Sequence, residues 1–406
     1  MRTDLYSFEA ALYRLLRIEA EASASIPAQD WQAVLRLADR EGLMPLVHAA
    51  IAGSGSNVPE SVRQALGHSY RHATEAARTA YAQLGEVVRA MQTRGVAVLL
   101  LKGAALARFT YRVAALRPFA DLDLLVRSKE VPAAHEALRS EGYAVVGEAP
   151  SPTDLAWRHA RAYFTPAKSQ ASRDAAGANA RWGGRIPVDL HWRLAGYPLT
   201  VETTASLFAQ AVSVDIDGER ARVPAPADLL VTLGVHFTRD LWYGKPRMRY
   251  VRDVAEVVRR HAVDWESVVE TVRRVPPART PVFLALSAAQ SLLDAAIPDE
   301  IMKALRPRAH GPIVRYLQHR TSRCMLRQER PHEAFIQIAL MRWLDAPSLG
   351  AYARWISAVA FVPRGLEASR RRWLSRILAR KPQAVGPDVQ LLENRHQSAH
   401  RRSSAR

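Results

Sequence analysis

The sequence predicts an α+β protein in which a small mixed β-sheet lies between two helical regions. Two observations carry this prediction. Apolar residues recur every three to four positions on both sides of the chain's centre, which is the period of a buried helix face. Between them, short apolar or alternating runs are bounded by glycine, as strands are. We therefore expect a helical region at 1–94, an α+β core at 95–225, a second helical region at 226–380 and a disordered basic tail at 381–406.

The first region opens with helical periodicity at Phe8, Leu12 and Leu15. A glycine- and serine-rich loop at 53–57 precedes Pro59, which suits the start of a long helix. We expect helical structure over 7–95, with one helix over 30–40, another from about residue 42 and a long one over 59–94.

The central region changes to the patterns of strands. A continuous apolar run ends at Gly103, an alternating acidic and apolar run follows it, and Asp217-Gly218 is a hairpin turn. The segment 167–184 is small, polar and glycine-bearing, so we expect a flexible insertion there. The strands expected are 96–101, 119–126, 142–146 and 186–192, with a hairpin over 212–223 and short helices at 104–111 and 131–141.

Composition bounds the class of protein. The chain has 406 residues and a formal net charge of +18, which favours anionic partners. Ten of the basic residues lie after Glu367, against two acidic ones, so the tail has the composition for a weak electrostatic contact with polyanions. A single cysteine, Cys324, excludes an internal disulfide and a cysteine-based zinc site, and it fits a cytoplasmic protein. No apolar run reaches the length of a membrane span.

The most informative residues for chemistry are acidic. Asp121 and Asp123 lie two apart on an expected strand, so both side chains leave the same face. Such a pair repels unless a cation lies between the carboxylates, and Mg²⁺ prefers oxygen ligands. Asp189 stands in another expected strand between apolar neighbours and shares a face with His191. The sequence therefore predicts a metal site built on these three carboxylates.

Several segments together resemble a known family. They are LADREGLMPLVHAAI, LLLKGAAL, RPFADLDLLV, EGY, VDLHWRL and RMRYVRDVAEVVRRHAVDW, spread over about residues 8–270. This pattern resembles the uncharacterised nucleotidyltransferase family of the DNA-polymerase-β-like superfamily. The resemblance implies a polymerase-β-like core and transfer of a nucleoside monophosphate from an NTP, with Mg²⁺ or Mn²⁺ as cofactor.

The resemblance also implies roles for residues. Asp121 and Asp123 would bind both metal ions and Asp189 would complete the catalytic metal site, with the further option of acting as general base. In the wider superfamily the first strand ends in Gly-Ser, whereas this chain has Gly103-Ala104. Lys102 and the backbone amides of Gly103 and Ala104 would then hold the phosphates. Arg117, which is close to the acidic pair in the sequence, is a further candidate that would neutralise either phosphate or Asp121.

Other residues keep two interpretations. His191 either orients a metal-bound group or is a buried hydrogen-bonded histidine. Arg249 and Asp253 are spaced as a plain helical ion pair, which we favour over contact with substrate. Lys102 is equally compatible with a surface lysine at a strand end, and His236 is a weak candidate for the site.

Three function classes remain at this point. A transferase is favoured, with a small molecule, a protein or an RNA end as the acceptor. A catalytically silent scaffold with the same fold is the alternative, and metal-dependent nucleotide binding separates the two. A basic nucleic-acid-binding protein ranks last, because basic and aromatic residues do not interleave. We also expect a chain ending at Arg380 to keep turnover on a small acceptor.

Overall fold

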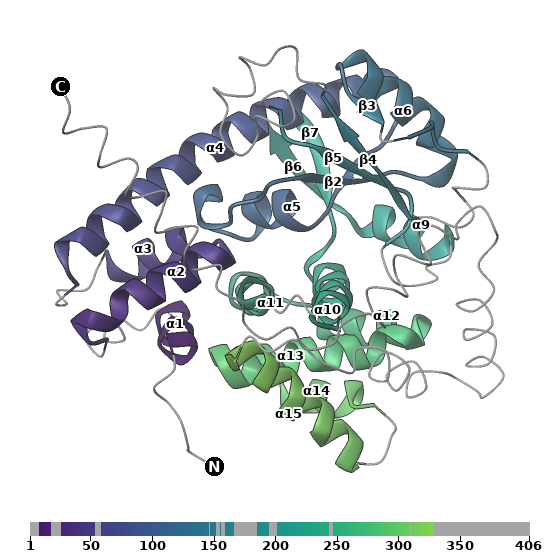
Figure 1. The fold of residues 1–406 in the computed structure, drawn as a ribbon. Coiled ribbons are helices and arrows are strands. Elements are labelled where there is room, and N and C mark those ends of the chain that lie inside the picture. Colours follow the sequence, from purple (N-terminus) through teal and green to yellow (C-terminus); the bar gives the residue numbers. More distant parts are fainter. Residues whose placement is uncertain are drawn as a thin grey trace, which may run out of the picture. The chain divides into compact units, whose positions relative to one another are not determined.

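The computed structural model describes ten segments of the chain, and every structural statement below refers to them. All belong to a compact unit that spans Met1–Pro347; a second unit, Ser348–Arg406, lies outside the described residues. The model combines a mixed sheet with many helices, which confirms the α+β class (Figure 1). The segments are 8–17, 26–52, 58–145, 147–151, 155, 159–165, 185–194, 201–242, 247–307 and 311–327.

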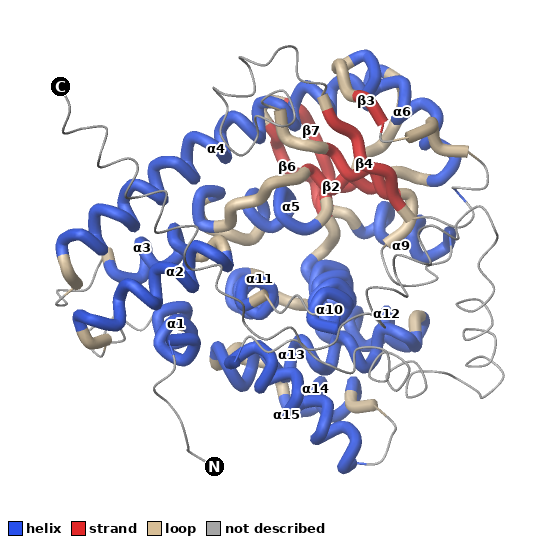
Figure 2. Tube along the Cα trace, in the orientation of Figure 1, coloured by secondary structure: helices blue, strands red, loops and turns tan. Residues whose placement is uncertain are grey.

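The sheet has seven strands in the order β3-β4-β5-β2-β1-β7-β6 (Figure 2). Strands β2 and β5, and likewise β1 and β7, run parallel, whereas the other neighbours run antiparallel. Their bounds are β1 Leu99–Leu100, β2 Leu122–Leu125, β3 Ala144–Val145, β4 Ala160–Phe164, β5 Val188–His191, β6 Val212–Ile216 and β7 Glu219–Val223.

One face of the sheet is covered by helices α4 (Glu60–Thr93) and α6 (Val131–Ser140). Leu84 and Met91 on α4 pack in the same core as Leu122 and Leu124 of β2. Since side chains alternate along a strand, Asp123, which lies between these two leucines of β2, faces away from α4. The pattern of apolar residues in β2 thus decides which face carries the acidic side chain.

The opposite face has less apolar cover. Leu99, Leu101 and Leu125 form a small core there with residues of helix α9 (Val201–Gln210). Helix α5 (Lys102–Phe109) follows β1 after a single residue and packs against β2. The polar positions of β2 and β5 lie on this second face, beside the start of α5.

The remaining helices share one large core. Residues from α1–α3 and from α10–α15 belong to it, so the two ends of the described chain pack together. Helices α10 and α13 approach so closely that a Cβ on Gly234 would lie 2.9 Å from the Cα of Val282. The bounds are α1 Phe8–Leu16, α2 Trp31–Glu41, α3 Met44–Ile51, α10 Pro226–Trp242, α11 Met248–Arg260, α12 Trp265–Arg274, α13 Arg279–Leu293, α14 Asp299–Leu305 and α15 Gly311–Arg327.

The structure differs from the expected elements in two respects. The first strand pairs over only two residues, because the chain turns into α5 at Lys102, whose φ is +47°. Strand β4 and helix α9 were not predicted. The expected insertion at 167–184, the tail from 381 and the helical pattern between 328 and 380 lie outside the described residues.

Within the part of the chain that the structure describes, none of the helices combines the length and apolar composition needed to cross a membrane.

Candidate functional site

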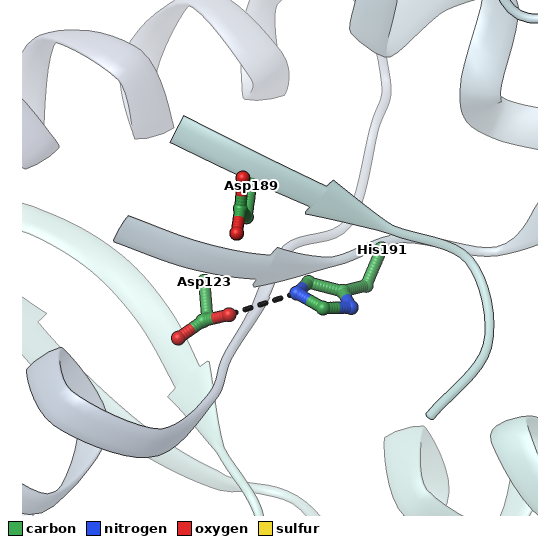
Figure 3. Close-up of side chains that lie close together, drawn as sticks. All are labelled: Asp123, Asp189 and His191. Carbon is green, nitrogen blue, oxygen red and sulfur yellow. Dashed lines mark hydrogen bonds and ion pairs between the residues drawn. The ribbon is translucent and has the colours of Figure 1, made fainter. Parts of the chain in front are cut away.

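The centre of the candidate site is a pair of carboxylates on neighbouring strands. Strand β2 pairs with β5 in parallel register, and Asp123 lies directly opposite Asp189. Ligand atoms of Asp123, Asp189 and His191 all lie within 4.8 Å of one another (Figure 3). The expectation that Asp189 lies beside Asp123 is therefore confirmed, although the two are far apart in the sequence.

His191 contacts Asp123 directly. Its Nε2 lies 2.8 Å from Oδ1 of Asp123, and both side chains are almost completely buried (Figure 3). The other ring nitrogen, Nδ1, is also buried and has no hydrogen-bond partner among the described residues. The histidine is thus both hydrogen-bonded and part of the acidic cluster, so the two interpretations of the sequence are compatible.

Lys102 provides the positive charge of the cluster. Its Nζ lies 2.5 Å from Oδ1 of Asp123, and the amide of Leu101 donates to the Asp123 carbonyl over 2.9 Å. The left-handed φ of Lys102 is uncommon for a residue with a Cβ, and such conformations concentrate at functional sites. The strained turn between β1 and α5 therefore brings the ammonium group to the carboxylate.

The charges around Asp123 and Asp189 act in opposite directions. Burial alone would raise the pKa of Asp123, but the hydrogen bond from His191 and the charge of Lys102 lower it well below its usual range. Burial and the charge of Asp123 raise the pKa of Asp189. The negative charge is thus concentrated on Asp123, and a second full charge beside it is unfavourable without a cation.

Asp121 precedes β2 and is exposed, and it is outside the group formed by Asp123, Asp189 and His191. Desolvation and the charge of Asp123 raise its pKa, while Lys102 and Arg249 oppose the shift. These interactions indicate that Asp121 lies near the cluster on its solvent side.

The donor set fits a divalent cation. Two carboxylates on adjacent strands offer the hard oxygen ligands that Mg²⁺ and Mn²⁺ take, with imidazole nitrogen in reach of the same point. The raised pKa of Asp189 is the unfavourable feature of the cluster without such an ion.

The start of α5 offers backbone donors. Leu101 is the N-cap and makes no side-chain capping bond, so the first amides of the helix, including those of Gly103 and Ala104, point to one end without a capping side chain. A Cβ on Gly103 would lie only 2.6 Å from the Cβ of Phe119, so this glycine lets α5 pack against the segment before Asp121. The glycine thus has a packing role that the sequence did not reveal.

Arg117 has a different role in the structure from the predicted phosphate contact. Its guanidinium is buried and forms two hydrogen bonds with Asp253, of 2.7 and 2.8 Å, and Nη1 donates to the carbonyl of Pro118. Tyr111 donates a further bond to Asp253 over 2.8 Å. These bonds engage Arg117 fully, and they correct the expectation that Asp253 pairs with Arg249.

Arg249, released from that pair, becomes a candidate that the sequence did not favour. Its charge lowers the pKa of Asp121, and its Nε is buried without a partner among the described residues. His236 on α10 is held by Arg239, whose Nη2 lies 3.0 Å from Nδ1, and burial lowers its pKa to about 3. The spacing of residues within α11 gave no signal for Arg249, because its neighbours come from other elements.

The sequence matches a known protein family. A family model described as an uncharacterised nucleotidyltransferase matches residues 27–294, which is most of the described chain. No curated protein matches the sequence. The matched range includes all the residues of the site described above.

Proposed function

Because the chain belongs to the uncharacterised nucleotidyltransferase family, we propose that it is a metal-dependent enzyme that transfers a nucleoside monophosphate from an NTP to an acceptor hydroxyl. The observation that carries the proposal is the parallel pairing of Asp123 with Asp189, which joins two carboxylates and His191 in one buried cluster. Carboxylates on neighbouring strands are the arrangement that metal-assisted phosphoryl transfer requires.

In this proposal Asp123 and Asp189, with Asp121 on the solvent side, hold Mg²⁺ or Mn²⁺. The bound metal neutralises charge on the phosphate oxygens as the transfer proceeds. His191 fixes the orientation of the Asp123 carboxylate through its 2.8 Å hydrogen bond. The protein's contribution is to hold the carboxylates in place before substrate arrives.

The triphosphate would lie at the start of α5. Amides of Gly103 and Ala104 donate to phosphate oxygens, and the positive end of the helix favours that charge. Lys102 pairs with Asp123, and the charges of Lys102 and Arg249 both act on Asp121. Lys102, which pairs with Asp123 in this structure, would be the residue to contact phosphate if a cation neutralised that carboxylate.

The transfer step is a substitution at phosphorus. The acceptor oxygen forms a bond to the α-phosphorus while the bond to the bridging oxygen breaks, so pyrophosphate leaves with the electron pair. The hydroxyl proton passes to a base, for which Asp189 is the candidate because it borders Asp123 on the less covered face of the sheet.

The test combines binding with turnover. Wild type, Asp121→Asn and Asp123→Asn are titrated with Mn²⁺ and then incubated with each labelled NTP and a cell extract. We expect both variants to bind Mn²⁺ at least tenfold more weakly and to lose transfer, with melting temperatures close to that of wild type. Wild-type transfer by either variant would refute the assignment.

A second candidate, a catalytically silent scaffold with the same fold, is favoured by one observation. Lys102 already neutralises Asp123 at 2.5 Å, as a cation would. Lys102→Met separates the two proposals. If the protein is an enzyme, Lys102→Met strengthens binding of Mn²⁺ alone and weakens binding of the Mn²⁺–NTP complex. If it is a silent scaffold, neither wild type nor Lys102→Met binds Mn²⁺ or the Mn²⁺–NTP complex. Arg108→Met, on the exposed side of α5, is the matched control.

The cellular setting and the partners are also proposals. The single cysteine, Cys324, is buried and forms no disulfide, as expected in a reducing cytoplasm, where NTP and Mg²⁺ are present. The basic segment after Glu367 would add a weak electrostatic contact with polyanionic partners.

A further inference from the structure

A cavity lies beside the acidic cluster, on the face of the sheet that α4 does not cover. Its volume is about 50 Å³ and its wall is mainly apolar. One water needs about 10–15 Å³ of such space, so the cavity holds a short chain of atoms. Lys102, whose ammonium group contacts Asp123, forms part of the wall, as do residues of α10 and α12. The cavity therefore adjoins the site at which transfer is proposed.

The two ends of the cavity carry opposite polarity. Asp228 and His236 both line it and lie eight residues apart on α10. At 1.5 Å per residue this separation is about 12 Å along the helix. Lys102 and His236 line the cavity near the carboxylate cluster, since the charges of both Lys102 and Asp123 act on His236. Asp228 stands about two helical turns away.

Asp228 is an unusual residue for an apolar wall. It is 4% exposed, and its Oδ2 is buried without a hydrogen-bond partner among the described residues. An acidic residue in the first turn of a helix is common, because it interacts well with the helix dipole. That interaction does not account for a buried carboxylate oxygen without a hydrogen-bond partner in the cavity wall, since such an acceptor is unfavourable.

We propose that this cavity binds the acceptor, and that the acceptor is a small, largely apolar molecule with a protonated amine at one end and a hydroxyl at the other. The inference rests on the proposed nucleotidyl transfer for the role of the hydroxyl. Asp228 binds the amine through a charge-assisted hydrogen bond. Lys102 repels the amine from the other end, so the hydroxyl lies beside Asp123 and Asp189.

This orientation determines the reaction. The hydroxyl oxygen bonds to the α-phosphorus of the NTP, the bond to the bridging oxygen breaks, and pyrophosphate leaves. The hydroxyl proton goes to Asp189, and the amine stays protonated on Asp228. A phosphodiester between the acceptor and the nucleotide results, with the positive charge of the acceptor retained.

The experiment uses three probes with one carbon skeleton: aminohexanol, hexanediol and hydroxyhexanoate. Each is titrated calorimetrically into wild type, Asp228→Asn and Thr232→Val. The last is the matched control, because Thr232 lies one turn further along α10 in the same wall and its hydroxyl bonds only the carbonyl of Leu229 among the interactions described. Melting temperatures and Mn²⁺–ATP binding are measured on all three proteins.

We expect wild type and Thr232→Val to bind aminohexanol roughly tenfold or more tightly than hexanediol, as a charge-assisted hydrogen bond predicts. In Asp228→Asn that preference disappears, while the melting temperature does not fall and Mn²⁺–ATP binding is unchanged. Equal binding of amine and diol by wild type, no binding of either, a preference that survives in Asp228→Asn, or tightest binding of the carboxylate would each overturn the inference.

The same measurements distinguish a failure of the proposed transferase function from a failure of the proposed acceptor class. If the amine preference depends on Asp228 but wild type does not bind Mn²⁺–ATP, the cavity binds amines and the transferase assignment is wrong. If Mn²⁺–ATP binds and the amine preference is absent, the transferase assignment stands and the acceptor class is wrong.

Discussion

At the scale of single residues, Asp123 determines the properties of the site. It is 3% exposed, yet it stays ionised because Lys102 and His191 both contact its Oδ1. A buried carboxylate of this kind is unfavourable unless it is paired. The lysine and histidine therefore keep the site folded before any cation binds, which explains how an acidic cluster persists in a buried position.

Gly103 cannot be replaced by a larger residue without a shift of the backbone around it. In Gly103→Ala the new Cβ would lie 2.6 Å from that of Phe119, so α5 or the segment before Asp121 must move. We expect a loss of about 1–3 kcal/mol in the free energy of unfolding, the usual cost of overpacking, and weaker Mn²⁺ binding. Urea unfolding and Mn²⁺ titration measure both effects.

Gly67→Ala is the control for this substitution. Gly67 is also helical, but its added Cβ meets only the ends of the Arg71 and His48 side chains, at 3.5 and 3.9 Å, so we expect a gain of up to about 1 kcal/mol. Equal effects of the two substitutions would show that helix propensity, and not the contact with Phe119, accounts for the result.

The raised pKa of Asp228 predicts that the stability of the protein depends on pH. Burial raises the pKa of its carboxyl to about 6 from an ordinary 3.8, and the charge of Arg274 on α12 opposes the shift. Lys102 and His236 line the far end of the same cavity. Because the folded pKa is the higher one, the stabilisation from protonated Asp228 is complete below about pH 4 and is lost as the pH rises through about 6.

Asp228→Asn should remove this dependence. Above about pH 7 we expect the variant to exceed wild type in free energy of unfolding by roughly 1–3 kcal/mol, and the difference should vanish near pH 4. Chemical unfolding at a series of pH values checks this, with the exposed Asp39→Asn on α2 as control. A variant that is less stable than wild type at pH 8 would contradict the prediction.

At the scale of elements, the pairing of β2 with β5 brings the site together. The start of β5 is held by Gln83 on α4, whose Nε2 donates to the Ile186 carbonyl over 2.8 Å and whose Oε1 accepts from the Ile186 amide over 3.0 Å. Tyr143 also contacts Gln83 and the same carbonyl. A helix on one face of the sheet thus fixes the strand that presents Asp189 on the other.

Gln83→Leu should therefore act on both folding and the site. It leaves the buried Ile186 amide without a partner, which costs about 1–3 kcal/mol, and it loosens β5 next to Asp189. We expect lower stability together with weaker Mn²⁺ binding. Gln92 is on the same helix as Gln83 and makes an exposed hydrogen bond to the Arg220 carbonyl, so Gln92→Leu should change neither property. Loss of stability with full Mn²⁺ affinity would disprove the link to Asp189.

The elements also show what the sequence could predict. The alternation of apolar and acidic residues in 119–126 and 186–192 was enough to predict both strands and the common face of Asp189 and His191. It could not predict that Arg117 pairs with Asp253, because that bond joins segments whose proximity depends on the packing of α11. It could not predict the cavity at Asp228 either, since a carboxylate in a first helical turn is ordinary and only burial makes it unusual.

At the scale of the whole molecule, the sheet and the helical body are joined by a buried ion pair. Arg117 follows the short helix Ala114–Leu116 beside the sheet, and Asp253 lies on α11 within the helical core. Their side chains are 6% and 0% exposed. Because Arg249 belongs to the same helix, α11 carries both this anchor and a candidate phosphate ligand, so the anchor would position part of the proposed nucleotide site.

Breaking this pair should destabilise the protein strongly and in a non-additive way. Arg117→Met leaves the Asp253 carboxylate with only Tyr111 as partner, and Asp253→Asn leaves a buried guanidinium. We expect each to cost about 3–5 kcal/mol in urea unfolding, and the double variant to cost clearly less than the sum, because it buries no unpaired charge. Arg117→Lys should not restore stability, since lysine cannot make the two parallel bonds.

If Arg117→Met instead unfolds like wild type but binds Mn²⁺–ATP poorly, Arg117 contacts phosphate as the sequence suggested, and the anchor between sheet and helices must lie elsewhere.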